Sequence, residues 1–163
     1  MKQHTIAVLV ENKHGAFIRV AGMFAAKAYN IDSLTVGATE ERDISRMTIV
    51  TRGDDQVIEQ ITKQLNKLID VIKVIDLTFD DFVERELALI KVHCTQSTRP
   101  EVMQIAEVFR AKVVDISPKT VTLEATGGKQ KVDAIIKMLS PFGIREMART
   151  GQVALKREFQ GEV

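Results

Sequence analysis

Residues 11–36 read ENKHGAFIRVAGMFAAKAYNIDSLTV, and an apolar stretch from Thr5 to Val10 precedes them. The apolar stretch predicts a strand, and the loop that follows it contains Gly15. Apolar residues then recur at helical spacing from Ala16 to Ala28, which predicts an amphipathic helix, and residues 31–39 predict a second strand. The chain therefore passes from a strand through a short loop into the N-terminus of a helix.

The loop before this helix has the features of a site for a small anion. The first N–H groups of a helix have no intrahelical partner, and the positive end of the helix dipole favours a carboxylate or a phosphate. Gly15 has no Cβ, so it can take a positive φ and a ligand can approach the main chain closely. Asn12 suits either a helix cap or a ligand contact, and His14 suits either a solvated side chain or a ligand contact. An ordinary turn without a ligand has the same local pattern.

The rest of the first half completes a βαββαβ order. Residues 44–51 predict a strand, Asp54 predicts the N-cap of a second helix, and residues 71–77 predict a fourth strand. The apolar face of the second helix comprises Val57, Ile58, Ile61, Leu65 and Leu68.

The second half repeats this order with a different sequence. Its predicted strands cover residues 87–94, 113–116, 121–125 and 144–148, and its predicted helices begin at Pro100 and carry the apolar residues Val132, Ile135, Ile136 and Leu139. We therefore predict an α+β fold with two tandem ferredoxin-like βαββαβ domains, over residues 1–78 and 87–163, joined by a linker over residues 79–86.

The loop after the first strand of the second half differs from the Gly15 loop. Residues 96–100 read QSTRP, with no glycine and with a proline that removes one N–H donor. We therefore expect a ligand site only in the first domain. The second domain is expected to be a coupling or docking module, with a structural spacer as the alternative.

Composition excludes several functional classes. The chain has 163 residues, of which 45% are hydrophobic and 28% charged, so it is expected to be globular. Its net charge is +1 and it has no block of Lys or Arg, which argues against a nucleic-acid partner. One cysteine excludes an intrachain disulfide, and no apolar run approaches the roughly 20 residues that span a bilayer. Since the start shows no signal-peptide pattern, a cytoplasmic location without membrane attachment is expected.

The sequence contains no pattern of catalytic or metal-binding residues. The three histidines, His4, His14 and His93, are scattered, and His93 and Cys94 alternate on a predicted strand, so they point to opposite faces. Cys94 is interpreted as a core residue. Gly127 to Lys129 lack the rest of a phosphate-binding loop and predict a turn before a helix. We therefore predict neither a catalytic residue nor a metal site in this chain.

Motifs in both halves resemble one known family. In the first half these are Glu11-Asn12-x-x-Gly15-Ala16-x-x-x-Arg19-Val20-x-Gly22-x-Phe24, Tyr29 to Val36, Ser45 to Ile49, and Lys63-Gln64-Leu65-x-Lys67-Leu68-Ile69. In the second half they are Val83 to Leu87, Phe109 to Ala111 with Val114-Asp115, and Ala148 to Gly151. In order and spacing these segments resemble the small, regulatory subunit of acetolactate synthase, whose N-terminal domain is an ACT domain.

The resemblance implies a function and a set of site residues. It implies a chain that is not catalytic by itself, that activates a catalytic subunit dependent on thiamine diphosphate, Mg²⁺ and FAD, and that confers feedback inhibition by valine. It implies a homodimer through the ACT domain. The effector would be held by Asn12, His14, Gly15, Ala16 and Phe17 of one chain, and approached by Asn30 and Ile31 of the neighbouring chain.

The sequence leaves the effector and the target enzyme open. One methylene in an apolar pocket changes binding by only roughly 1–3 kcal/mol, so valine, isoleucine and leucine cannot be ranked. Phe17 stands where this family often has an aliphatic residue, which could narrow the pocket. An ACT-type sensor for another biosynthetic enzyme remains the alternative, whereas a transcription regulator would need a helix-turn-helix or a basic surface, and neither is found.

Overall fold

The structure is a computed structural model that describes residues 2–158. The chain divides into two compact units. The first contains residues up to Val83 and those from Gln152 onward, and the second contains Glu84–Gly151. Each unit has the βαββαβ order and one antiparallel sheet, which confirms the predicted α+β fold with two tandem ferredoxin-like domains.

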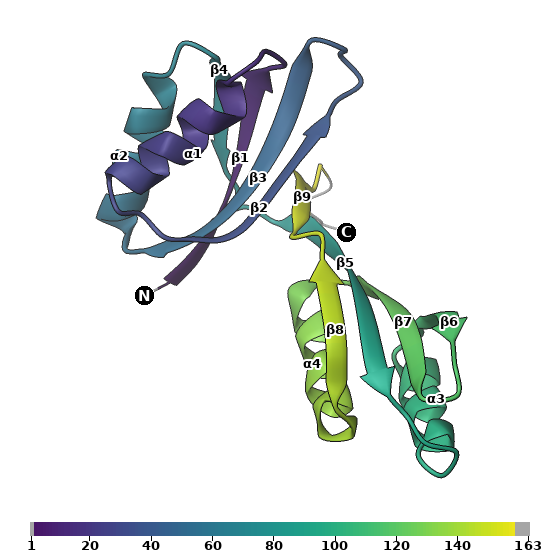
Figure 1. Ribbon diagram of the computed structural model, residues 1–163. Helices are drawn as coiled ribbons and strands as arrows, with labels where there is room; N and C mark the ends of the chain where they lie inside the picture. Colours follow the sequence, from purple (N-terminus) through teal and green to yellow (C-terminus); the bar gives the residue numbers. More distant parts are fainter. Residues whose placement is uncertain (1, 159–163) are drawn as a thin grey trace. The chain divides into compact units, whose positions relative to one another are not determined.

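The first unit places two helices on one face of a four-stranded sheet (Figure 1). Its elements are β1 (Lys2–Glu11), α1 (Ala16–Ala26), β2 (Ile31–Ala38), β3 (Ile44–Gly53), α2 (Asp55–Asn66) and β4 (Val71–Asp76). The strand order is β2-β3-β1-β4, so β2 and β4 are the edge strands of the sheet.

Alternation along the strands builds the core of this unit. Every second residue of β1 and β3 faces the helices, and these apolar side chains pack with those of α1 and α2. The buried cluster comprises Ile6, Val8, Val10, Val20, Phe24, Met47, Ile49, Ile58, Ile61 and Leu65. The predicted cap of α2 is confirmed, because the Asp54 side chain accepts a hydrogen bond from the Val57 amide at 2.9 Å.

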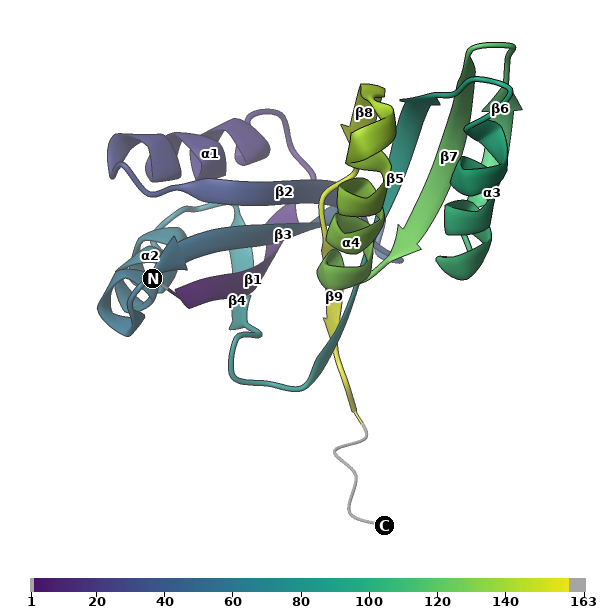
Figure 2. The same cartoon turned by 90° about the horizontal axis from the view of Figure 1, so that it is seen from below.

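The second unit repeats this architecture, and its elements can be followed in Figure 2. They are β5 (Phe82–His93), α3 (Arg99–Val108), β6 (Lys112–Ile116), β7 (Thr120–Gly127), α4 (Lys129–Leu139) and β8 (Ile144–Arg149), with a 3₁₀ turn at Ser140–Phe142. The strand order is β6-β7-β5-β8. Cys94 is buried in the core, as predicted, whereas His93 is exposed.

Two boundaries differ from the predicted ones. Strand β5 begins at Phe82, so residues 82–86 are not linker but the start of a strand. The chain also returns to the first unit after Gly151, whereas the sequence assigned all of residues 87–163 to the second domain. The predicted linker was too long. Phe82 and Val83 favour strands, but they directly follow Asp80 and Asp81, whose acidic side chains suggested a loop.

The returning segment forms β9 (Val153–Lys156), which the sequence analysis did not predict. Ala154 packs against Ala7 and Leu77 on the side of the first sheet opposite the main core. The Arg46 guanidinium donates to the Ala154 carbonyl at 2.9 Å, and the Gln152 amide donates to the Ser33 hydroxyl at 3.1 Å. These contacts cover the helix-free face of the sheet around Ala7.

A charged cluster joins β5, α4 and β8 in the second unit. Glu86, whose side chain is 3% exposed, pairs with Arg149, and Arg149 also reaches Asp133 at 3.1 Å. Lys129 donates to Asp133 at 2.5 Å, and this hydrogen bond lowers the pKa of the Asp133 carboxyl. The cluster fixes the start of β5 to the end of β8.

Candidate functional site

The Gly15 loop has the backbone geometry that the sequence predicted. Gly15 has a φ of 82° and forms the N-cap of α1, where no side chain caps the helix. A left-handed conformation strains other residues, which explains the glycine. The Ala16 amide donates to the Lys13 carbonyl at 3.2 Å, but the amides of Phe17 and Ile18 have no partner within residues 2–158. The helix therefore begins with two free donors.

An ion pair from outside the loop holds this helix start. Arg19 pairs through Nε with Asp70, whose side chain is 7% exposed, and its Nη2 donates to the His14 carbonyl at 3.2 Å. The hydrogen bond with Asp70 raises the pKa of the Arg19 guanidinium. The Asp70 carbonyl accepts from the Glu11 amide at 2.8 Å. Arg19 and Asp70 thus connect the end of β1, the loop and α1.

The sequence analysis did not identify the role of Asp70. The predicted βαββαβ order did indicate this contact. Antiparallel pairing of β1 with β4 places Asp70, the residue before β4, beside the end of β1. Arg19 follows Gly15 by four residues, which puts both on one side of the first helical turn.

Asn12 does not cap the helix. Its backbone amide donates to the Asp43 carbonyl at 2.8 Å, and its side-chain Nδ2 donates to the Arg42 carbonyl at 3.4 Å. The turn between β2 and β3 therefore borders the loop. One N–H of Nδ2 is engaged in this way, so Oδ1 and the second N–H of Nδ2 remain for a ligand.

The other predicted residues of the loop differ in exposure. The side chain of His14 is exposed, that of Ala16 is buried, and Phe17 is 45% exposed. Ala16 is also engaged through its amide, so neither part of it is open to a ligand. Among the predicted residues of the loop, Phe17 offers a ligand both an exposed apolar side chain and a free backbone amide.

Asn30 and Ile31 lie at the far end of α1 from Gly15. Asn30 donates through Nδ2 to Asp32 at 2.7 Å, and its carbonyl accepts from the Thr51 hydroxyl. The helix between has 11 residues and is therefore about 16 Å long. Within one chain the structure does not bring these two residues to the Gly15 loop.

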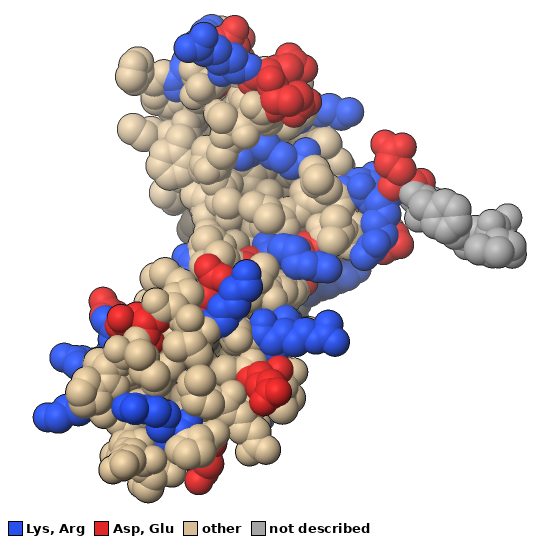
Figure 3. All heavy atoms as spheres, turned by 90° about the vertical axis from the view of Figure 1, so that its right-hand side faces the viewer, with Lys and Arg blue, Asp and Glu red and all other residues tan. Residues whose placement is uncertain are grey.

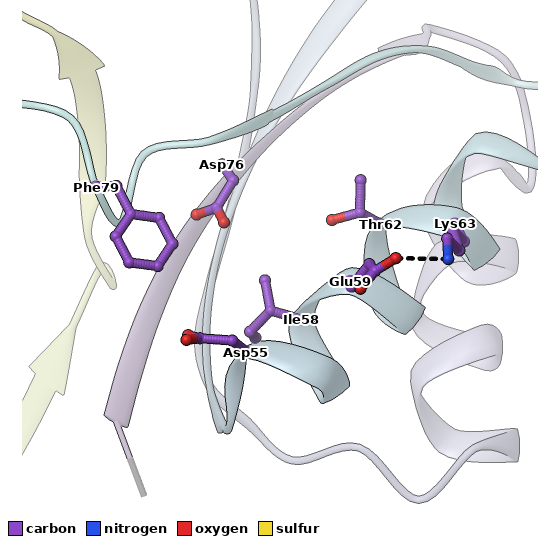
Figure 4. Close-up of a pocket in the computed structure, with 7 residues that line it drawn as sticks. All are labelled: Asp55, Ile58, Glu59, Thr62, Lys63, Asp76 and Phe79. Atoms are coloured by element: carbon purple, nitrogen blue, oxygen red, sulfur yellow. Dashed lines mark hydrogen bonds and ion pairs between the residues drawn. The ribbon is translucent and has the colours of Figure 1, made fainter.

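A separate hollow in the first unit lies along α2 and beside Phe79 (Figure 4). It measures about 350 Å³ and is lined by Asp55, Ile58, Glu59, Thr62, Lys63, Asp76 and Phe79. Its one lysine pairs with Glu59 at 2.6 Å, so the remaining charges are carboxylates that repel an anion. It shares no residue with the predicted site.

The described part of the chain shows neither a block of one charge on the face in Figure 3 nor a cluster of metal ligands. Figure 3 shows basic and acidic side chains mixed on the face that it draws. Among residues 2–158 no three His, Cys, Asp or Glu side chains come together as metal ligands. In the same range, no helix has the length and apolar character needed to cross a bilayer.

Comparison with known proteins places the chain in a family. Residues 6–73 match the family described as "AHAS small subunit-like ACT domain", and residues 85–158 match "Small subunit of acetolactate synthase". The acetolactate synthase small subunit of Aquifex aeolicus is 56% identical over 97% of this chain and 83% of its own length. A probable acetolactate synthase small subunit of Archaeoglobus fulgidus is 54% identical over 95% of this chain and 97% of its own.

A solved structure gives the same result. The crystal structure of the acetolactate synthase small subunit from Thermotoga maritima is 42% identical, covers 96% of this chain and 98% of its own, and superimposes with a TM-score of 0.88. With this fold, these motifs and these relatives, the chain belongs to the acetolactate synthase small subunit family, and its first unit is an ACT domain of that family.

Proposed function

We propose that this chain is a regulatory subunit that binds the catalytic, large subunit of acetolactate synthase, raises its activity and makes it sensitive to feedback inhibition by valine. The "small subunit" name of the relatives supports a larger partner. Thiamine diphosphate, Mg²⁺ and FAD would be held by that partner.

The Gly15 loop is the observation that carries this proposal. The free amides of Phe17 and Ile18 would donate to the carboxylate of the effector, with the helix dipole adding to the attraction. Because Arg19 and Asp70 already neutralise each other, the guanidinium braces the loop instead of taking the ligand charge. The loop is therefore built before the ligand arrives, which limits the entropic cost of binding.

A second copy of the chain would complete the site. β2 is an edge strand of the sheet. Antiparallel pairing of β2 with β2 of the second copy would protect this edge. If the two-fold axis passes between Leu34 and Thr35, Ile31 of the copy lies opposite Ala38, at the end of β2 that leads into the turn beside Asn12. Asn30 and Ile31 of the copy would then reach the Gly15 loop that they cannot reach within one chain.

The polar atoms left over in this arrangement match an amino acid. Oδ1 of Asn12, or the amide oxygen of Asn30 from the second copy, would accept from the ammonium group. Ile31 and Phe17 would cover the aliphatic side chain. Because each site would use both copies, occupancy would be linked to the dimer geometry, and this linkage is what transmits the signal.

Reconstitution with the catalytic subunit tests this function. The purified chain alone should form no acetolactate, its addition should raise the turnover of the catalytic subunit, and valine should lower the raised rate. A sedimentation measurement on the same sample should show a dimer. Product from the chain free of catalytic subunit, or unchanged turnover on mixing, would contradict the proposal.

A further inference from the structure

A hollow in the second unit occupies the position that the Gly15 loop has in the first. It measures about 650 Å³, within the roughly 300–1,000 Å³ of small-molecule sites. It lies where β5 ends, α3 begins, the β6–β7 turn approaches and the segment before β8 passes. In the first unit the corresponding parts are the end of β1, the start of α1, the β2–β3 turn and the segment before β4.

The main chain at this place offers no free donors at the start of the helix. The Arg99 amide donates to the Thr95 carbonyl at 2.9 Å, and the amides of Glu101 and Val102 donate to the Thr98 carbonyl at 3.1 and 3.2 Å. Pro100 has no N–H. A ligand in this hollow would therefore be recognised by side chains, unlike a ligand at Gly15.

Side chains of opposite charge line the hollow without neutralising each other. Lys119, on the β6–β7 turn, and Glu101, in the first turn of α3, both border it. Neither side chain forms an ion pair in the part of the chain that the structure describes. Phe142 supplies an apolar wall, and Thr95 and His93 supply further polar groups. This set complements a small molecule with one positive charge, one negative charge and an apolar part.

We propose that this hollow is a second amino-acid site, specific to the C-terminal unit. Lys119 would hold the α-carboxylate, Glu101 the α-ammonium, and Phe142 would contact an apolar side chain. A 2-oxo acid of the same shape lacks the ammonium, so Glu101 would repel it. The site is independent of the one proposed at Gly15, since the two share no residue.

Nuclear magnetic resonance of the full-length chain tests this inference. The Gly15→Asp variant serves as the background, so that binding at the first unit is weakened, and L-valine and 3-methyl-2-oxobutanoate are the probes because both carry an isopropyl group. L-Valine should shift the amide signals of Thr95 and Lys119, and the oxo acid should bind at least about tenfold more weakly.

Matched variants assign the two charges. Lys119→Gln and Glu101→Gln should each weaken L-valine binding about five- to tenfold, whereas Lys112→Gln, an exposed lysine on β6 that does not line the hollow, should leave it unchanged. Glu101→Gln should also lower the ratio of the affinity for L-valine to the affinity for 3-methyl-2-oxobutanoate. Absence of shifts at Thr95 and Lys119 up to about 10 mM valine, or equal affinity in the Lys119 and Lys112 variants, would overturn the proposal. Signals of Ile18, followed in the wild-type chain, report separately on the site at Gly15.

Discussion

A pair of substitutions at Gly15 separates the effect of backbone strain on stability from the effect of charge on ligand binding. At a φ of 82° an L residue is strained by roughly 1–2 kcal/mol. An added Cβ would lie 2.7 Å from Nη1 of Arg19, so the guanidinium, which donates to the His14 carbonyl, must shift. Asn and Asp differ little in shape, so Gly15→Asn and Gly15→Asp share both effects and differ by one negative charge.

The charge difference sets the expected effect on binding. Arg19 and Asp70 are neutral as a pair, so Asp at position 15 leaves one net negative charge beside the free amides. A ligand carboxylate at roughly 4 Å is then repelled by about 1 kcal/mol in bulk water and by about 4 kcal/mol at the effective dielectric constant near a protein surface. The lower figure alone corresponds to about fivefold in the dissociation constant.

Calorimetry and urea denaturation measure the two effects separately. Both variants should lose about 1–2 kcal/mol of unfolding free energy, and valine should bind at least about fivefold more weakly to the Asp variant than to the Asn variant. The difference should shrink at high salt because part of it is screened. If the two folded variants bind valine equally well at the first unit, as followed by the amide signal of Ile18, the carboxylate does not lie at the start of α1.

Three further predictions concern stability. Glu86→Gln should lower the unfolding free energy by about 1.5–3 kcal/mol in urea, because Arg149 loses a buried charged partner; no loss would mean that the pair is not formed. The pKa of Asp133 is lower in the folded chain than its ordinary value of 3.8, so its stabilisation is present above that pH and is lost as the pH falls through the folded value. Urea unfolding of Asp133→Asn should therefore show lower stability than wild type at pH 7 and no difference well below pH 3.8, and a constant difference would refute this. A fragment of residues 1–80 should unfold at lower urea than the same fragment with residues 152–158 fused through a Gly/Ser linker, because β9 covers Ala7; equal midpoints would show β9 to be dispensable.

Local patterns were sufficient to predict twelve of the regular elements, because alternation in strands and helical spacing in helices mark which side of each element is buried. They failed for β9, whose four residues contain too little pattern to be recognised. This strand is held by Ala7, Leu77 and Arg46, residues more than seventy positions away, and only the folded sheet brings them to it.

The same division holds for the candidate site. The sequence by itself determined the Gly15 loop, since a strand, a glycine and an amphipathic helix in this order leave few backbone paths, and only glycine takes the left-handed conformation without strain. Tertiary structure decided what holds the loop. Arg19 and Asp70 are 51 residues apart, and pairing of β1 with β4 makes them neighbours. It also decided that the second unit has a hollow at Lys119, because the hollow depends on how separate strands and turns meet in space.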